Sequence, residues 1–258
     1  MSLRIAFDLD GVLADMDTAL LRQAETVFGE EMARSLQAGA AEPTDVSRDQ
    51  GASDVRSDSQ DEHARPSAAG DATPPLARLK MTPRQQRKLW RHVATVENFW
   101  ETLEETEPGI VARLAKLAAE RRWEIIFLTK RPKTLGATAQ VQSQRWLASK
   151  GFPLPSVYVV TGSRGRIAAA IDLDVVVDDR PENCLDITID SKARAILVWR
   201  DDEKALPAGA RRLGIGVVRS VSDCLDILTT LDEHQTQQDP GLLARVRKML
   251  GLKESASV

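Results

Sequence analysis

The chain has 258 residues, of which 42% are hydrophobic and 28% charged, the balance of a globular protein with one large domain or a core and a smaller domain. Its net charge of −3 gives no reason to expect a nucleic acid partner, and the lack of any run of about 18 apolar residues predicts that nothing spans a membrane. Two cysteines without metal-like spacing, Cys184 and Cys224, and an N-terminus without a charged-then-apolar leader predict a cytoplasmic protein with free thiols.

The first predicted element is an apolar strand, residues 3–7, that runs into Asp8 and Asp10. Gly11 follows directly and allows a sharp turn. Buried sheet does not accommodate paired carboxylates, whereas the sites of open parallel sheets lie at the carboxyl ends of the strands. We therefore expect Asp8 and Asp10 to carry chemistry.

A helical insertion is predicted next, because about 110 residues separate this strand from the following one, far more than a single crossover needs. A first helix is indicated after Gly11 by apolar residues on one face, namely Leu13, Met16, Leu20, Ala24, Val27 and Phe28. A second helix begins at Thr82 and Pro83, an N-cap and first-turn pair, and runs to about residue 97. The insertion is expected to cover residues 14–104.

Residues 38–75, inside this insertion, differ in composition from the rest of the chain. They contain no aromatic residue, no Leu and no Ile, and eight acids stand against three arginines. Such a segment cannot bury enough apolar surface to offset the entropy lost on ordering it. We predict a disordered acidic loop here.

Short apolar runs alternate with helical patterns through the rest of the chain. Strands are expected at residues 124–128, 157–160, 174–177 and 195–199, with a candidate sixth at 215–218. Helices are expected at residues 110–120, 141–149, 164–171 and 221–231. This alternation predicts an α/β fold with a doubly wound parallel sheet, built from residues 1–13 and 105–231.

The tail, residues 232–258, is polar except for a short amphipathic helix at residues 242–250. Such a helix either docks on the core or on another protomer, or contacts a membrane surface or a partner protein. A homo-oligomer is therefore left open by the sequence.

Polar residues follow three further strands, at positions 129–132, 161–164 and 178–181. In a parallel sheet these ends meet the first acidic pair at one edge. Carboxylates gathered at one place repel each other unless a cation lies among them, and oxygen ligands without His or Cys favour Mg²⁺, whose shell is commonly completed by substrate phosphate. Thr129 and Arg164 supply a hydrogen bond and a positive charge for that phosphate. The set predicts phosphoryl transfer to a carboxylate nucleophile, with a second carboxyl group as acid and base.

The order of these motifs resembles the haloacid dehalogenase-like (HAD) superfamily of phosphatases over residues 1–36 and 76–230. The motifs are Asp-Leu-Asp-Gly-Val at residues 8–12, an apolar run ending in Thr129, a basic residue, and an apolar run ending in Asp178-Asp179. The resemblance implies a Rossmann-like core with a helical cap inserted after the first motif. It also implies Mg²⁺ as the cofactor.

The resemblance also implies a role for each matching residue. Asp8 would attack phosphorus, and Asp10 would protonate the leaving oxygen, later activate water and lend its backbone carbonyl to the metal. Thr129, with Lys130 beside it, would hold the phosphoryl group. The metal ligands would be Asp8, Asp10, Asp179 and, beside it, Asp178.

The family's third motif usually holds a lysine, and the corresponding stretch here, residues 162–166, has none. Spacing to Asp179 favours Arg164 as the replacement, with Arg166 second. Arginine binds phosphate through a planar fork and is not equivalent to an ammonium group. Arg164 is accordingly expected to bind phosphate.

Residues 98–104 and 177–181 resemble stretches of the 5′(3′)-deoxyribonucleotidases, in which cap aromatics stack on the base. This implies a substrate contact for Phe99 and Trp100, whereas an aromatic pair at a domain junction usually packs in a core. The deoxyribonucleotidases have Thr-Ser-Pro after the second strand, where this chain has Thr129-Lys130-Arg131-Pro132. The extra positive charge favours a more anionic or smaller phosphate ester.

The sequence as a whole predicts a Mg²⁺-dependent phosphomonoester hydrolase that acts through an aspartyl-phosphate on a small phosphorylated metabolite or a nucleotide. The alternative is a catalytically weakened fold that binds a phosphate ligand or a protein.

Overall fold

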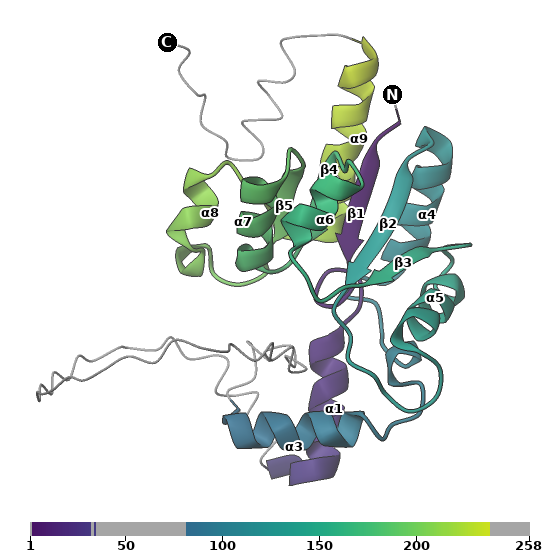
Figure 1. Ribbon diagram of the computed structural model, residues 1–258, viewed down its shortest axis with the longest axis vertical. Helices are drawn as coiled ribbons and strands as arrows, with labels where there is room; N and C mark the ends of the chain where they lie inside the picture. Colours follow the sequence, from purple (N-terminus) through teal and green to yellow (C-terminus); the bar gives the residue numbers. More distant parts are fainter. Residues whose placement is uncertain (1, 32–33, 35–80, 238–258) are drawn as a thin grey trace, which may run out of the picture.

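The computed structural model describes residues 2–31, 34 and 81–237, and places a parallel sheet at the centre of this part of the chain (Figure 1). The sheet has six strands in the order β3-β2-β1-β4-β5-β6, and every neighbouring pair is parallel. The strands are β1 (Arg4–Asp8), β2 (Glu124–Thr129), β3 (Ser156–Val159), β4 (Val175–Asp178), β5 (Arg194–Val198) and β6 (Gly216–Val218). This is the strand order of a Rossmann-like sheet, so the predicted fold class is confirmed, including the candidate sixth strand.

Helices cover both faces of the sheet (Figure 1). They are α4 (Ile110–Arg121), α5 (Ala139–Ser149), α6 (Arg164–Ala170), α7 (Pro181–Asp190), α8 (Ala208–Arg212) and α9 (Val221–Gln237), with short 3₁₀ turns η1 (Phe99–Glu101) and η2 (Glu203–Ala205). Because successive strand residues point to opposite faces, β1 sends Ile5 and Phe7 into the apolar cluster of α4, α5 and α9, and Ala6 into that of α6, α7 and α8. Burial on both faces explains why the strands are apolar at nearly every position.

The register of the central strands aligns their carboxyl ends. Phe7 of β1 pairs with Phe127 of β2 on one side and with Val177 of β4 on the other. The next residues, Asp8 and Asp178, therefore leave the sheet beside each other. Parallel pairing thus brings two carboxylates together that lie far apart in the sequence.

Two helices lie beyond these strand ends, α1 (Met16–Phe28) and α3 (Pro83–Val93), and they pack against each other (Figure 1). Thr82 and Gln85 form a capping box that begins α3 where the sequence predicted it. The helix ends at Val93 and not near residue 97, because the hydroxyl and N–H of Thr95 both donate to the His92 carbonyl and close the last turn.

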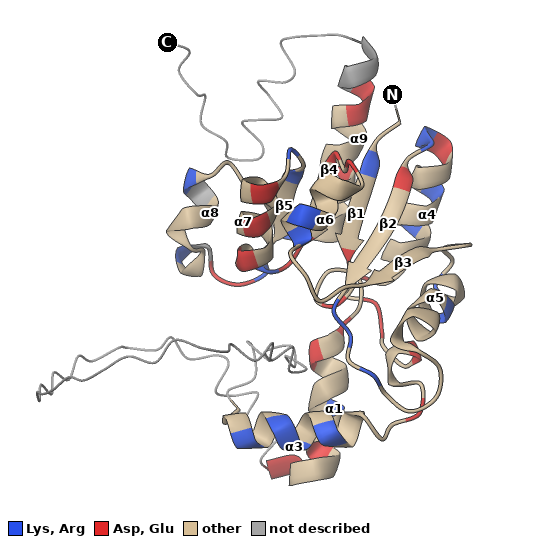
Figure 2. Ribbon diagram, viewed as in Figure 1, with Lys and Arg blue, Asp and Glu red and all other residues tan. Residues whose placement is uncertain are grey.

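Basic side chains recur along α3 (Figure 2). One of them fastens the helix to α1: Lys88 Nζ lies 5.0 Å from the centre of the Phe28 ring and donates to the Val27 carbonyl at 3.3 Å. This lysine has a structural contact within the described part of the insertion.

The chain passes into the insertion and back out of it through neighbouring segments. The Asp15 N–H donates to the Glu104 carbonyl, and the Thr106 N–H donates to the Leu13 carbonyl, each at 2.9 Å. These two hydrogen bonds lie at the boundaries that the sequence predicts between core and insertion. The division into a core and a cap stays a proposal.

The last helix is longer than predicted. α9 continues to Gln237, beyond the expected end at residue 231, because Arg121 of α4 pairs with Asp232 at 3.4 Å and with Glu233 at 2.6 Å. The predicted acidic loop 38–75 and the predicted tail helix 242–250 lie outside the described residues. Among the described helices, none is both long enough and apolar enough to cross a bilayer.

Candidate active site

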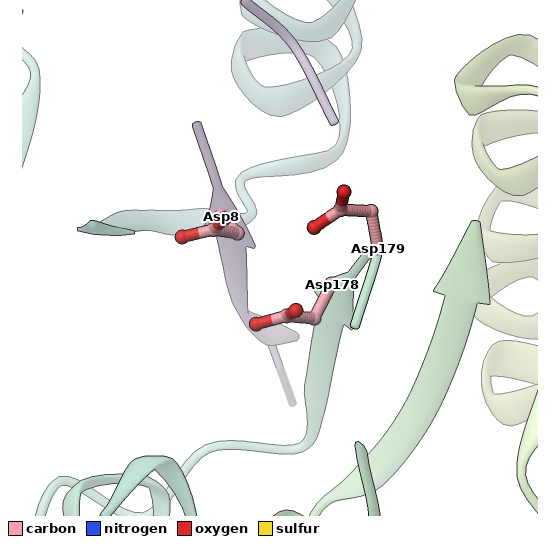
Figure 3. A group of neighbouring side chains, drawn as sticks. All are labelled: Asp8, Asp178 and Asp179. Carbon is pink, nitrogen blue, oxygen red and sulfur yellow. The ribbon is translucent and has the colours of Figure 1, made fainter. Parts of the chain in front are cut away.

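Three carboxylates meet at the carboxyl ends of the central strands (Figure 3). Asp8 ends β1, Asp178 ends β4, and Asp179 follows it directly. One oxygen of each lies within 4.8 Å of the others, and Asp8 and Asp178 are buried. Asp10 is not a member of this group, although it lies only two residues after Asp8.

The electrostatics of the group are unfavourable without a cation. Burial raises the pKa of the Asp8 carboxyl group well above its ordinary value, the guanidinium of Arg164 opposes the rise, and the neighbouring carboxylates add to it. Burial likewise raises the pKa of Asp178, again against the effect of Arg164. Buried oxygen donors of like charge fit a hard divalent cation such as Mg²⁺.

The side chain of Arg164, the first residue of α6, lies beside two of these carboxylates, Asp8 and Asp178. Its Nη2 donates to Asp8 Oδ1 at 2.8 Å, and its Nε lies 3.9 Å from Asp178 Oδ2. Its Nη1 is buried and has no hydrogen-bond partner among the described residues. Arg166, the second candidate from the sequence, has a side chain that is 84% exposed and faces Asp190. The structure therefore places Arg164, and not Arg166, among the carboxylates.

Asp178 is held by the start of the following helix. The Arg180 N–H donates to its Oδ1 at 2.9 Å, and Asn183 Nδ2 lies 3.0 Å from both of its oxygens. Sequence reasoning did not identify Asn183. A helix that begins at Pro181, two residues after Asp179, is the signal that would have placed Asn183 about one turn beyond the acidic pair.

Asp10 is bound by the loop that follows β2. Thr129 Oγ1 donates to Asp10 Oδ2 at 3.1 Å, and Arg131 Nη2 donates to Asp10 Oδ1 at 2.7 Å. The Nε of Arg131 also lies 3.0 Å and 3.1 Å from the two oxygens. In this structure the Thr129 hydroxyl thus donates a hydrogen bond to Asp10. Arg131 was not identified as a site residue by sequence reasoning.

Phe99 and Trp100 pack in the core, which is the alternative to a substrate contact that the sequence left open for this pair. Both side chains are fully buried, and their rings meet edge to face with centres 4.9 Å apart. The indole N–H of Trp100 donates to the Pro132 carbonyl at 3.0 Å. A ring that is enclosed in this way has no face open to a base.

A cavity of about 530 Å³ opens over the carboxylates. Five of the residues that the sequence proposed for the site line it, namely Asp8, Asp10, Lys130, Arg164 and Asp179. The lining also includes residues that the sequence did not single out, namely Met16 and Asp17 of α1, Arg180, Asn183 and Trp199. This volume suits a small ligand.

No protein-family model matches the chain, and no curated protein matches it. Among solved structures, it is similar to a hydrolase from Pseudomonas syringae, at 17% identity and a TM-score of 0.46, over 90% of this chain and 99% of that one. A putative beta-phosphoglucomutase from Thermotoga maritima is 16% identical, with a TM-score of 0.46, over 88% and 98%. A HAD family hydrolase from Deinococcus radiodurans R1, with bound phosphate and sodium, is 15% identical, with a TM-score of 0.48, over 90% and 96%. At this level of likeness, function has to be argued from the residues of the site.

Proposed function

We propose that the protein is a HAD-like hydrolase, a Mg²⁺-dependent phosphomonoesterase that acts through an aspartyl-phosphate on Asp8. The observation that carries the proposal is the meeting of Asp8, Asp178 and Asp179 around Arg164 at the mouth of a cavity. Three grouped acids, two of them buried, with an arginine among them have no purpose in packing, but they suit a metal and a phosphate that arrive together.

The unpartnered Nη1 of Arg164 supports a phosphate ligand. A buried guanidinium N–H without an acceptor is unfavourable, and a phosphoryl oxygen would satisfy it. The Nη2 of the same side chain holds Oδ1 of Asp8, which leaves Oδ2 as the attacking atom. Arg164 would thus bind the phosphoryl group and orient the nucleophile.

The proposed reaction has two steps. In the first, an Asp8 oxygen forms a bond to phosphorus, the ester bond breaks, and Asp10 gives a proton to the leaving oxygen. In the second, water attacks the aspartyl-phosphate, Asp10 takes its proton, and Asp8 is released as a carboxylate. Mg²⁺, held by Asp8, Asp178, Asp179 and the Asp10 carbonyl, would supply positive charge against the phosphoryl oxygens.

The proposed substrate is a small phosphorylated metabolite or a nucleotide. The cavity volume supports a ligand of this size, and Lys130 lies on its lining. A 5′-nucleotidase activity is part of this proposal, but the buried Phe99 and Trp100 give it no support. Trp199 is the aromatic residue among those that line the cavity.

The nucleophile is tested by Asp8→Asn in a hydrolysis screen of nucleotides, sugar phosphates, phosphoglycolate and an aryl phosphate, with and without Mg²⁺. We expect the variant to lose at least about a thousandfold in kcat/KM, because the amide cannot form the covalent intermediate. Asp172→Asn is the matched control, since Asp172 is exposed ahead of β4, far from its carboxyl end. Undiminished hydrolysis by Asp8→Asn overturns the mechanism. A wild-type protein that binds phosphate but hydrolyses nothing in the screen supports the binding-module alternative.

A further inference from the structure

The side chain of Asp10 is held in one orientation by the loop that follows β2. It receives hydrogens from three donors, Nε and Nη2 of Arg131 and the hydroxyl of Thr129, at 2.7 to 3.1 Å. All three are donors, so both oxygens of the Asp10 side chain accept hydrogen bonds. Its side chain is still 11% exposed and lies on the cavity lining.

Arg131 is itself fixed by the surrounding structure. Its side chain has no solvent exposure, and its Nη1 donates to Ser143 Oγ of α5 at 2.8 Å. Its guanidinium carbon lies 4.8 Å from the centre of the Trp100 ring and 6.0 Å from that of Trp146. Trp100 of η1 and Trp146 of α5 therefore contribute to the site indirectly, because the guanidinium of Arg131 packs against their rings.

A gain in the stability of the fold does not explain why Arg131 and Asp10 form an ion pair that is so little exposed. Removing two charged groups from water is unfavourable, and an apolar pair of similar volume is often as stable. The arrangement instead fixes the position of the Asp10 carboxyl group through the hydrogen bonds from Arg131 and Thr129, while part of the group stays exposed on the cavity lining. A preorganised base of this kind needs no rearrangement when the substrate reacts.

We propose that Arg131 is a positioning residue, which holds Asp10 as the base of the second step. The inference rests on the proposed function. In that step the oxygen of water forms a bond to phosphorus, and the bond from phosphorus to the Asp8 oxygen breaks. The electron pair returns to Asp8, and the proton of water passes to Asp10. Arg131 touches no reacting atom and acts only through Asp10.

The two steps can be separated with 2,4-dinitrophenyl phosphate, whose leaving group departs without a proton. Formation of the aspartyl-phosphate then does not need Asp10, whereas its hydrolysis does. A protein that lacks Arg131 should form the intermediate normally and hydrolyse it slowly. Loss of structure alone would slow both steps together.

The experiment is rapid-mixing kinetics of dinitrophenolate release in the presence of Mg²⁺, with Arg131→Gln. We expect a stoichiometric burst at the wild-type rate, followed by a linear phase slowed at least about tenfold, since a positioned base contributes about a hundredfold or more. Arg131→Lys keeps the charge but not the two-point contact, and should slow the linear phase at least about threefold while it preserves the fold. Arg145→Gln is the control, because Arg145 lies on the same helix as Ser143 with an exposed side chain paired to Glu101, and it should behave as wild type.

The inference is overturned if the burst and the linear phase fall together in the variants, or if the linear phase is unchanged. Should Arg131→Gln not fold, as judged by circular dichroism, Arg131→Lys alone decides by the same criteria. Failure of the proposed function looks different: the wild-type protein then releases no dinitrophenolate with Mg²⁺, or Asp8→Asn releases it with the same burst.

Discussion

Gly11 sets how closely Asp179 can approach the end of β1. Its φ of +82° lies in the left-handed region, and a Cβ placed on it would overlap the Asp179 carboxylate. Gly11→Ala therefore strains the backbone and also displaces one of the three grouped carboxylates. We expect the variant to lose at least about tenfold in Mg²⁺-dependent kcat, because a displacement of about 1 Å costs rates of up to about a hundredfold. Steady-state kinetics over a Mg²⁺ series measures the effect.

Gly29→Ala is the control that has the backbone strain of a positive φ without the steric overlap with Asp179. Gly29 has nearly the same φ, +85°, but a Cβ there meets no atom within 4 Å. Both variants should be destabilised by at least about 1 kcal/mol, and Gly11→Ala by more because of the overlap, but only Gly11→Ala should lose activity. Equal losses of kcat in the two variants, or no loss in either, would contradict the role assigned to this close approach.

At the scale of single residues, the sequence was informative where position along a strand decides the environment. Asp8 and Asp178 follow apolar runs, and parallel pairing then brings them together. The sequence could not show that Arg131 would turn toward Asp10, because the path of a loop decides where its side chains point. For Phe99 and Trp100 the deciding neighbours lie far along the chain, in the loop after β2 and in α5.

At the scale of elements, Glu107 ties the start of α9 to the start of α4. Its carboxylate accepts from the N–H groups of Val221 and Ser222 at 2.6 and 2.9 Å and from the Ser222 hydroxyl at 2.7 Å. Burial works in the opposite direction, but these hydrogen bonds together with Arg200 lower the pKa of Glu107 from its ordinary value of 4.5. An anion at a helix N-terminus stabilises the folded state in this way.

Glu107→Gln should lower the free energy of unfolding by about 1 kcal/mol at about pH 7. A carboxyl group whose folded pKa lies below its unfolded value stabilises above the unfolded value, and this contribution is lost as the pH falls through the folded pKa. The difference between wild type and variant should therefore shrink steadily below pH 4.5. Urea unfolding over a pH series measures it.

Glu120→Gln provides the comparison for this prediction. Glu120 lies in α4 and forms an exposed pair with Lys116 at 3.8 Å, and such pairs contribute little. Its loss should leave the urea midpoint nearly unchanged at every pH. A difference between wild type and Glu107→Gln that is constant with pH would show that the hydrogen bonds do not depend on the charge.

The elements with a clear apolar pattern could be predicted from the sequence, and two helices without such a pattern could not. The six strands and the helices α4, α5, α6 and α9 fall where apolar periodicity puts them. The helices α7 and α8 were missed because their inward residues are few: α7 buries only Cys184 and Ile187, and α8 has five residues. Such helices are stabilised by the strands they cover, which a local pattern does not contain.

At the scale of the whole molecule, the site lies where the strand order reverses. From β1 the chain adds β2 and β3 on one side and then β4, β5 and β6 on the other. The connections after β1 and β4 leave in opposite directions, which opens a crevice between their carboxyl ends. Asp8 and Asp178 stand on the two sides of this crevice, so topology alone puts the carboxylates where a ligand can enter. The helices α1 and α3 then lie over the same edge (Figure 1).

A cation bound in this crevice should stabilise the entire fold. Its ligands come from strands that are not consecutive in the chain, so unfolding must release it. Burial, which raises the pKa of Asp8 and Asp178, shows that their charged forms are unfavourable without one. At a free Mg²⁺ concentration of about 100 Kd the gain is about 2.7 kcal/mol, or about 5–10 °C in Tm for a chain of this length. Thermal unfolding followed by circular dichroism over a Mg²⁺ series measures it.

Two variants decide whether the effect comes from this site. Asp179→Asn removes one oxygen charge from the group and should abolish most of the Mg²⁺-dependent rise in Tm. Asp172→Asn removes a charge near the opposite end of β4, and since Asn adopts its φ of +52° readily, the rise should persist in full. A rise of equal size in both variants would mean that Mg²⁺ acts elsewhere on this acidic protein. No rise in the wild type would mean that the carboxylates meet for a reason other than a metal.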